Sequence, residues 1–350
     1  MSDNHQVAVV VIGRNEGDRL KRCFASLQAQ HSGPIVYVDS GSSDGSVAYA
    51  RQIEVQVVEL AMDQPFTMAR ARNAGLMYVS DQHPDCNLVQ FVDGDCEVAP
   101  GWLTMARDYL EQHPQVVAVC GNRVERFPDA SVYNQLIDME WQALAGEVEA
   151  CGGDAMYRTD PLLMVDGFNN CMIAGEEAEL GRRLTATGLS IMRLDEPMTT
   201  HDANMQKLSQ WWLRSIRCGH AYAQGYDLQR HNRVAGRGLY RRRQVLSSLF
   251  YGIALPVLFL VFGAMLITIS LPAASNIFVY SAMLFLLSLY VRVVQKSACA
   301  KMPLGNSVKQ CFLYGYFVAL AKFPEAQGVL KYYKNKVFGK TAKIIEYRHG

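Results

Sequence analysis

Acidic residues almost disappear from the last third of this chain. Of the 33 Asp and Glu residues in the 350-residue sequence, only Glu325 and Glu346 lie beyond Gln229, whereas 17 of the 34 Lys and Arg residues lie there. The formal net charge of +1 therefore conceals an acidic front and a basic back. Long apolar runs separate the basic stretches of the back, which favours a membrane surface and argues against a nucleic acid as its partner.

The sequence also lacks any Cys-x-x-Cys pair. Its nine cysteines are scattered and odd in number, which argues against a zinc ribbon or a disulfide framework, so we expect free thiols in a reducing compartment. The N-terminal stretch has no basic segment before a long apolar core, as a secretory signal would. Neither Gly-x-Gly-x-x-Gly nor Gly-x4-Gly-Lys-Ser/Thr occurs, so neither a Rossmann dinucleotide site nor a P-loop is supported.

The first hundred residues do contain a regular alternation of strand and helix patterns. The apolar, β-branched runs are 7–13, 34–39, 55–60 and 87–95, and the helical patterns between them are 17–30, 46–53 and 67–81. Such alternation predicts an α/β domain whose parallel strands are covered by helices on both faces. Open sheets of this class bind ligands at the carboxyl ends of their strands.

The middle of the chain is less regular. We predict helices at 100–114, 175–188 and 201–225, a strand at 116–124, and a loop with a short strand and the start of a helix at 150–168. The last of these helices is aromatic-rich and amphipathic. The sequence therefore continues the domain with mixed elements instead of extending the simple alternation.

The basic C-terminal region contains two long apolar stretches, 244–271 and 277–294. Arginines and lysines flank both outer ends and none lies in the turn between them, which predicts a transmembrane hairpin with both flanks in the cytoplasm. A buried helical hairpin of a soluble domain is the alternative. Residues 304–323 predict an interfacial helix, or alternatively a third span, before a basic aromatic tail. We therefore divide the chain into an α/β domain, 1–229, and a membrane-associated region, 230–350.

Asp93-Gly94-Asp95 ends the fourth predicted strand. Two carboxylates on a tight, exposed loop suit a hard divalent cation, which in phosphate sites takes one or two carboxylates plus phosphate oxygens. Asp-Gly is also an ordinary turn signal. The motif alone therefore favours a turn over a metal site.

Polar clusters follow other predicted strands and helices. Asn15 and Glu16 follow the first strand, and Asp39 and Asp44 follow the second within VDSGSSDGS. Their alternative role is that of Ser/Gly turns and helix caps. Arg72 and Asn73 lie in RARNAG, where a diphosphate could be paired, and their alternative is a solvated helix face.

The order of these motifs resembles that of family 2 glycosyltransferases. VVIGRNEGDRLKRCFASL, VYVDSGSSDGS, RARNAG, FVDGDCEVAPGWL and AGEEAELGRRL occur in the family's order over about residues 7–225. The resemblance implies a GT-A (Rossmann-like) mixed-sheet domain followed by transmembrane and interfacial helices. The chain is similar in particular to membrane-associated bacterial members of the family that build exopolysaccharide or other envelope glycans.

The resemblance also implies roles for individual residues. Asn15, Glu16, Asp39 and Asp44 would cradle the donor nucleotide, and Arg72 and Asn73 would lie near its ribose and diphosphate. Asp93 would touch the nucleoside and Asp95 would coordinate Mn²⁺ or Mg²⁺. The wall of the donor-sugar and acceptor site would run from Gly153 through Asp154 to Arg158.

The Gly-Glu-Glu of AGEEAEL matches the family's Gly-Glu-Asp pattern, which supplies the catalytic base. The second acidic position is Glu177, and Glu176 remains a rival, because either side chain could reach an acceptor hydroxyl. The alternative for both is an acidic first turn favoured by the helix dipole.

For two further features, the sequence allows either a functional role or a structural one. His201 follows a predicted strand and is either a ligand of the metal or diphosphate, or a structural histidine. Trp211 and Trp212, with Arg214, either cover the acceptor site or pack their helix. QWWLR departs from the Gln-x-x-Arg-Trp signature of processive synthases because Ser215 follows Arg214, which argues against a polymer-extruding synthase.

The expected activity is inverting, metal-dependent transfer of one sugar from a nucleotide-sugar, UDP-linked rather than GDP-linked, to a lipid-linked saccharide. The catalytic domain would lie on the cytoplasmic side of the cell inner membrane, in contact with membrane lipids and no nucleic acid. A nucleotidyltransferase would share the metal aspartate but have no use for a base at Glu177. A non-catalytic membrane adaptor on the same fold is the other alternative.

Overall fold

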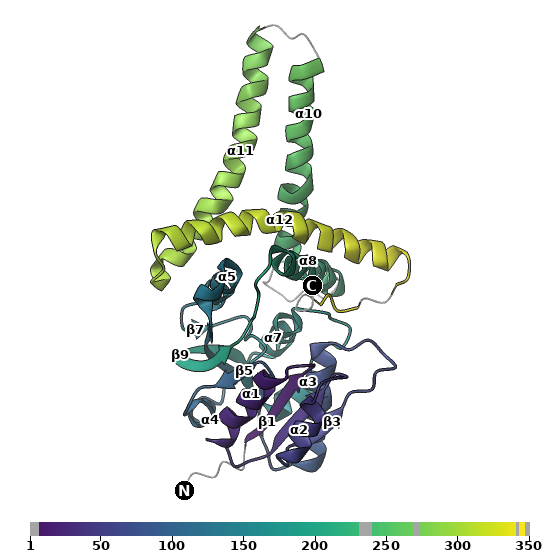
Figure 1. Ribbon diagram of the computed structural model, residues 1–350, viewed down its shortest axis with the longest axis vertical. Coiled ribbons are helices and arrows are strands. Elements are labelled where there is room, and N and C mark those ends of the chain that lie inside the picture. Colours follow the sequence, from purple (N-terminus) through teal and green to yellow (C-terminus); the bar gives the residue numbers. More distant parts are fainter. Residues whose placement is uncertain (1–6, 231–239, 269–272, 341–342, 347–350) are drawn as a thin grey trace. The chain divides into compact units, whose positions relative to one another are not determined.

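The computed structural model describes residues 7–230, 240–268, 273–340 and 343–346 (Figure 1). The chain divides into two compact units, Met1–Gln206 and Lys207–Gly350. This division comes before the helix at 208–229, which the sequence pattern groups with the α/β domain. The functional assignment of that helix stays a prediction.

The first unit is built on one large sheet. Its strands are β1 (Val7–Gly13), β2 (Ile35–Asp39), β3 (Gln56–Glu59), β4 (Leu88–Asp93), β5 (Cys96–Val98), β6 (Val116–Glu125), β7 (Gly146–Glu147), β8 (Ala155–Arg158) and β9 (Ser190–His201). They lie in the order β3-β2-β1-β4-β8-β6-β9-β5, and β7 pairs with β9.

Strand direction changes in the middle of this sheet. The pairs among β3, β2, β1 and β4 are parallel, as the alternating sequence pattern predicts. β8 then runs antiparallel to both β4 and β6, while β9 is parallel to β6 and antiparallel to β5. The sheet is therefore mixed, as the resemblance implies, and the short strand β5 was not predicted.

Helices cover both faces of the parallel half. The ring of Phe24 in α1 (Asp18–Gln28) lies 5.8 Å from that of Tyr37, and α2 (Ser46–Gln52) contributes Tyr49 to the same cluster. On the other face, Gly75 of α3 (Met68–Gln82) lies against Val10 and Val38. Because side chains alternate along a strand, Tyr37 and Val38 point to opposite faces.

The remaining elements of this unit surround the antiparallel strands. They are α4 (Trp102–Gln112), η2 (Pro128–Ala130), α5 (Val132–Trp141), α6 (Thr159–Met164) and α7 (Glu176–Ala186). The helix predicted at 201–225 begins later than expected. His201 is the last residue of β9, where it pairs with Cys96 of β5, so its backbone belongs to the sheet.

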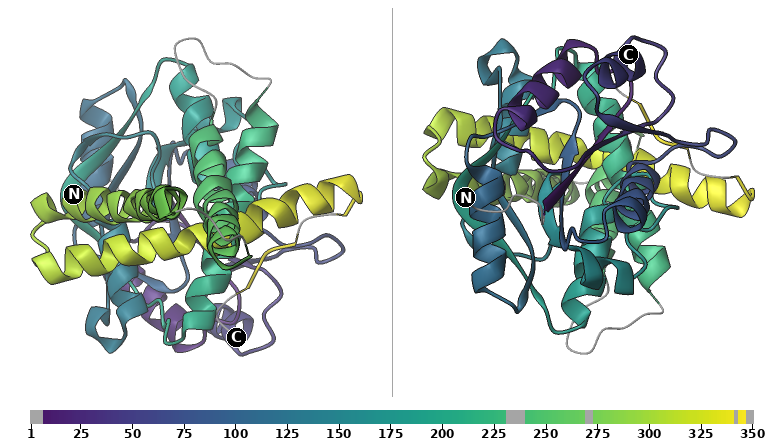
Figure 2. Two further views of the ribbon diagram at one scale, coloured as in Figure 1. Left: turned by 90° about the horizontal axis from the view of Figure 1, so that it is seen from above. Right: turned by 90° about the horizontal axis from the view of Figure 1, so that it is seen from below.

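The second unit consists of helices. They are α8 (Leu208–Gln229), α9 (Arg242–Leu249), the π-helix η3 (Phe250–Ala254), α10 (Leu255–Thr268), α11 (Ala273–Lys301), η4 (Met302–Leu304) and α12 (Val308–Val337). α10 and α11 lie side by side, and α12 passes beneath them in the view from above (Figure 2). Two stretches, Arg242–Leu266 and Asn276–Leu304, are long and apolar enough to cross a membrane.

The helix after the hairpin is longer than the predicted 304–323. α12 starts at a capping box, in which the Ser307 hydroxyl accepts from the backbone N–H of Gln310, and it continues through Pro324 to Val337. It packs on α8 through small residues, because the backbone at Gly219 directly faces Glu325 and that at Gly328 faces Ile216. Part of the predicted basic tail is therefore helical.

Candidate active site

The carboxyl ends of three parallel strands bring the predicted polar residues to one edge of the sheet. In the strand register, Gly13 of β1 pairs with Asp39 of β2, and Ile12 pairs with Asp93 of β4. The loops that follow these strands must therefore lie side by side. The polar clusters that follow β1, β2 and β4 therefore converge at this edge.

The first two of these loops are tied to each other. The side-chain oxygen of Asn15 accepts a hydrogen bond of 2.8 Å from the Ser43 N–H, and Asp44 accepts one of 3.1 Å from the Gly17 N–H. Asp39 accepts from the N–H groups of Gly41 and Ser42 and so shapes its own turn. These contacts are those of turns, and nucleotide binding by Asn15, Asp39 and Asp44 stays a prediction.

Arg72 is the centre of a buried ionic cluster. Its guanidinium in α3 is 1% exposed and lies 2.9 Å from Asp93 Oδ1, 2.7 Å from Glu176 Oε1 and 3.4 Å from Glu177 Oε1. One arginine thus joins the exit of β4 to the first turn of α7. The Glu179 carboxylate instead pairs with Arg183 in its own helix, 2.7 Å away, so the acidic first turn of α7 has divided roles.

A second arginine completes the surroundings of Asp93. Arg123 of β6 lies 3.2 Å from Asp93 Oδ2 and also pairs with the buried Asp154, which accepts a 2.8 Å bond from the Asp93 N–H. A Cβ atom at Gly153 would lie 2.5 Å from Asp93 Oδ2. Only glycine lets this loop approach the aspartate so closely.

Two of the three acidic partners of Arg72, Asp93 and Glu177, have pKa values shifted in opposite directions. Burial alone would raise the pKa of Asp93, but the guanidinium groups of Arg72 and Arg123 hold it at about 2. Burial, reinforced by the neighbouring Glu176 carboxylate, raises the pKa of Glu177 to about 7 in spite of Arg72. Asp93 is therefore a fixed anion, whereas Glu177 can exchange a proton near neutral pH.

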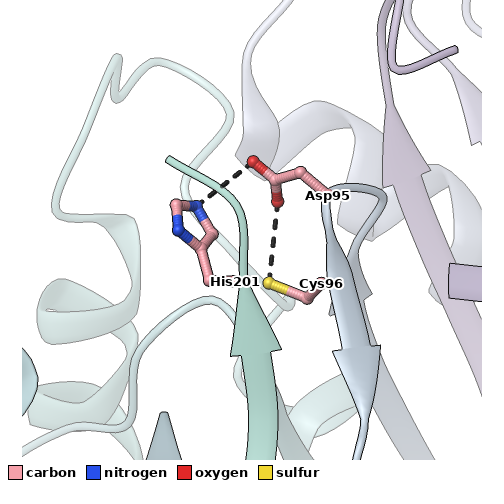
Figure 3. Close-up of side chains that lie close together, drawn as sticks. All are labelled: Asp95, Cys96 and His201. Carbon is pink, nitrogen blue, oxygen red and sulfur yellow. Dashed lines mark hydrogen bonds and ion pairs between the residues drawn. The ribbon is translucent and has the colours of Figure 1, made fainter. Parts of the chain in front are cut away.

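Asp95, the other aspartate of the motif, faces His201. His201 Nε2 lies 3.2 Å from Asp95 Oδ2, and the Cys96 thiol lies 3.6 Å from Asp95 Oδ1 (Figure 3). The strand pairing of Cys96 with His201 across β5 and β9 places the imidazole beside the aspartate. The sequence motifs predict a role for both residues, but only the sheet brings them together.

The donor atoms at this point suit Mn²⁺ or Mg²⁺. One ligand atom each from Asp95, Cys96 and His201 lies within 4.8 Å of the others. Burial and the nearby Asp154 raise the pKa of the Cys96 thiol well above its usual range, so it stays protonated. A carboxylate oxygen and an imidazole nitrogen are suitable ligands for a Mn²⁺ that also binds diphosphate oxygens.

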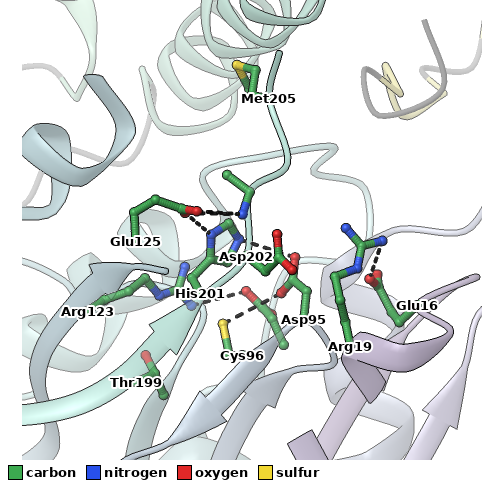
Figure 4. A network of polar contacts seen from close by, with 12 residues as sticks. Glu16, Arg19, Asp95, Cys96, Arg123, Glu125, Thr199, His201, Asp202 and Met205 are labelled. Carbon is green, nitrogen blue, oxygen red and sulfur yellow. Dashed lines mark hydrogen bonds and ion pairs between the residues drawn. The ribbon is translucent and has the colours of Figure 1, made fainter. Parts of the chain in front are cut away.

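Glu125, which sequence analysis missed, orients His201. Its Oε2 lies 3.2 Å from His201 Nδ1 and accepts a 3.1 Å bond from the Ala203 N–H (Figure 4). The Trp141 ring contacts the His201 imidazole in a T-shaped arrangement, with the two ring centroids 4.7 Å apart. A carboxylate on the far nitrogen fixes the ring direction of a metal-binding histidine. The pairing of β6 with β9 creates this contact between residues 76 positions apart.

Comparison with known proteins gives the family of the first unit. Residues 8–173 match the family described as glycosyl transferase family 2, a range that contains Asp93, Asp95 and Arg72. The first unit contains a glycosyltransferase family 2 domain. A search of curated proteins finds no match.

Two solved structures share the fold of this glycosyltransferase. The mannosyltransferase PcManGT from Pyrobaculum calidifontis, solved in complex with GDP-Man and Mn²⁺, is 18% identical, with a TM-score of 0.57 over 93% of this chain and 87% of that one. S. aureus TarS 1–349 is 14% identical, with a TM-score of 0.51 over 96% and 92%. At these identities the likeness concerns the fold alone.

One predicted site residue of the glycosyltransferase lies elsewhere. Arg158 was expected in the acceptor wall with Gly153 and Asp154. Because β8 runs antiparallel to β4, Arg158 pairs with Leu88, at the start of β4, while the loop before β8 reaches Asp93 at its end. The Arg158 guanidinium donates to backbone carbonyls, including that of Val116 at 2.9 Å. This corrects the expected position of Arg158.

Other predicted residues of the glycosyltransferase make structural contacts. Glu16 pairs with Arg19 at 2.9 Å, and Asn73 of α3 bonds both the N–H and the carbonyl of Phe168. In the second unit, Trp211 packs on Phe317 and Trp212 donates to Gln327, both in α12. The two tryptophans therefore pack α8 on α12, and acceptor binding by them and by Arg214 stays a prediction.

Proposed function

We propose that this glycosyltransferase inverts the anomeric centre as it transfers one sugar from a nucleotide-sugar to a lipid-linked acceptor at a membrane. The observation that carries the proposal is the cluster around Arg72. It holds a carboxylate with a pKa of about 7, Glu177, beside a permanently ionised one, Asp93. A base poised near neutral pH is what deprotonation of a sugar hydroxyl requires.

Glu177 suits the base better than its neighbour Glu176. The Glu177 side chain is 19% exposed and 3.4 Å from Arg72, whereas Glu176 is 1% exposed and held at 2.7 Å. An acceptor hydroxyl could reach Glu177, which would take its proton while the oxygen attacks the anomeric carbon. Glu176 and Arg72 would hold Glu177 in position.

Asp95 and His201 would hold Mn²⁺ or Mg²⁺ at the donor diphosphate. When bound, such a cation neutralises the charge that develops on the leaving nucleoside diphosphate. Asp93, which Arg72 and Arg123 fix in place, would accept hydrogen bonds from the nucleoside. Such a division gives the two aspartates of the motif separate tasks.

The nucleotide of the donor is proposed to be UDP. The Pyrobaculum mannosyltransferase was solved with GDP-Man and Mn²⁺, so GDP-mannose is the second donor to test. Both share the diphosphate that the metal site would bind. The loops that carry Asn15, Asp39 and Asp44 would surround the nucleoside.

A membrane-borne acceptor is supported by the exposure of the two apolar helical stretches. Of the 18 most apolar consecutive residues, only 6% are buried in Arg242–Leu266 and 11% in Asn276–Leu304. The core helix of a soluble protein would be mostly buried. Large side chains such as Leu260, Phe278 and Leu284 are about 70% exposed. Such surface is stable in hydrocarbon and unfavourable in water. An anchored enzyme would meet an acceptor that never leaves the membrane, in envelope or exopolysaccharide biosynthesis.

The test is glycosyl transfer by the purified full-length protein with UDP-sugars or GDP-mannose, Mn²⁺ and a lipid-linked acceptor. Glu177→Gln should lower the rate by a factor on the order of 10² to 10⁴, the usual contribution of a general base, with donor binding retained. Asp95→Asn should instead weaken Mn²⁺-dependent donor binding. Unchanged transfer by Glu177→Gln would refute the assigned base.

A further inference from the structure

The second unit contains a pocket of about 840 Å³ between the start of the first apolar helix and the end of the second. Arg242, Arg243, Leu246 and Phe250 line one side, and Arg292 and Lys296 line the other. Arg292 and Lys296 are one helical turn apart on α11, so their side chains share a face. The pocket therefore combines four cationic groups with an apolar wall.

The one acidic residue in the region of these four cations is already paired with another lysine. Between Arg230 and Ile345 the sequence contains one acidic residue, Glu325, and its carboxylate pairs with Lys322 at 2.7 Å and accepts from Ser248. Within the described residues, no ion pair involves Arg242, Arg243, Arg292 or Lys296. Four like charges around one cavity repel one another, and a bound anion would relieve that repulsion.

The wall of the pocket is a built feature of the fold. The π-helix η3 interrupts the helical path between α9 and α10, and π-helical turns are frequent at functional sites. The Tyr290 hydroxyl of α11 donates to the backbone carbonyl of Tyr251 in η3. Gly252 lies directly against the backbone of Lys322 in α12, where a Cβ atom would be 2.2 Å from the carbonyl oxygen. The two sides of the pocket are thus tied together.

The apolar parts point to an amphiphile. Leu246 and Phe250 line the pocket and are 53% and 41% exposed, and α10 and α11 carry further exposed apolar side chains, Val257, Phe285 and Val291. Free phosphate would use the cations but leave this surface unused. A lipid with a phosphate headgroup would use both, with its chains along the hairpin.

We propose that this pocket binds the phosphate headgroup of a membrane lipid. The shared chemistry is an ester or diphosphate anion attached to hydrocarbon chains, as in an anionic phospholipid or in the polyprenyl diphosphate of an acceptor. The inference rests on the membrane placement proposed above and is independent of the sugar-transfer chemistry. It assigns Arg292 and Lys296 a lipid-binding role in addition to that of topology signals.

The experiment is a lipid titration of the full-length protein in a neutral detergent, read by native mass spectrometry. A detergent micelle presents no charged surface, so only a specific site distinguishes phosphatidylglycerol from phosphatidylcholine. Arg292→Gln with Lys296→Gln should weaken phosphatidylglycerol binding about tenfold or more, as expected for two charges next to a lipid phosphate. Lys331→Gln with Lys334→Gln on α12 removes the same charge outside the pocket and should leave binding unchanged.

Competition identifies the source of the phosphate. A polyprenyl diphosphate that displaces phosphatidylglycerol would identify the acceptor as an occupant, and failure to displace it would identify the phospholipid; both results support a lipid phosphate site. Displacement by inorganic diphosphate at equal concentration would overturn the proposal, as would equal losses in the two double variants. Because no sugar donor is present, these results do not depend on whether the enzyme transfers sugars as proposed.

Discussion

At the scale of single residues, the environment of Glu177 makes activity pH-dependent. Burial and Glu176 raise the pKa of Glu177 to about 7, and a general base acts only when deprotonated. We expect kcat/KM to rise with pH through about 7 and to fall about tenfold per pH unit below it. A rate profile measured from pH 5.5 to 9 in the wild-type enzyme checks this. A flat acid limb would contradict it.

Glu125 is expected to act through His201. Glu125→Gln keeps an oxygen that can accept from the Ala203 N–H but removes the charge facing His201 Nδ1. Loss of such an outer partner typically weakens metal binding about 10- to 100-fold. Titration of Mn²⁺ by electron paramagnetic resonance measures this change without any turnover.

The matched control for Glu125→Gln is Asp129→Asn, which removes an exposed carboxylate from η2 nearby. It should leave the Mn²⁺ affinity at the wild-type value. If Glu125→Gln bound Mn²⁺ as tightly as the wild type, the role of Glu125 would be only to shape the 201–205 segment. Thermal unfolding of both variants separates that structural effect from metal binding.

At the scale of elements, the crossing of α8 and α12 depends on glycine. A Cβ atom at Gly328 would lie 2.0 Å from the Ile216 carbonyl oxygen, so Gly328→Ala must push the helices apart. Overpacking of this kind costs about 1–3 kcal/mol, in excess of the helix propensity that alanine adds. We expect a lower unfolding temperature of the detergent-solubilised protein.

Gly263→Ala in α10 is the control for that variant. The space around Gly263 is open to 4 Å, so alanine there adds helix propensity without a clash. Its unfolding temperature should equal or exceed that of the wild type. If Gly328→Ala behaved in the same way, close backbone contact at the crossing would not be a source of stability.

At the scale of the whole molecule, the proposed topology places both basic flanks of the hairpin in the cytoplasm. A membrane-impermeant maleimide added to spheroplasts should then label Asn276→Cys, near the turn. It should not label the wild-type chain, whose exposed thiols Cys171 and Cys299 would face the cytoplasm. Labelling of the wild type before lysis would contradict this orientation.

Much of the first unit is predictable from local pattern. The β-branched runs and helical spacing locate β1 to β4 and the helices between them, because period-2 and period-3.6 patterns are local properties. The late start of α8 and the short strand β5 are not predictable in this way. Both depend on the pairing of β5 with β9, which joins Cys96 to His201 across more than a hundred residues.

The sequence by itself determined the fold class, the family motifs, the acidic first turn at Glu176 and Glu177, and the two apolar stretches. Each of these features belongs to a short segment, so the local pattern of residues is enough to predict it. Only the tertiary structure decided that Arg72 joins Asp93 to Glu177, that Glu125 orients His201, and that Arg158 lies at the other end of β4. Those relations depend on strand direction and register, which arise when segments far apart in the chain pair in one sheet.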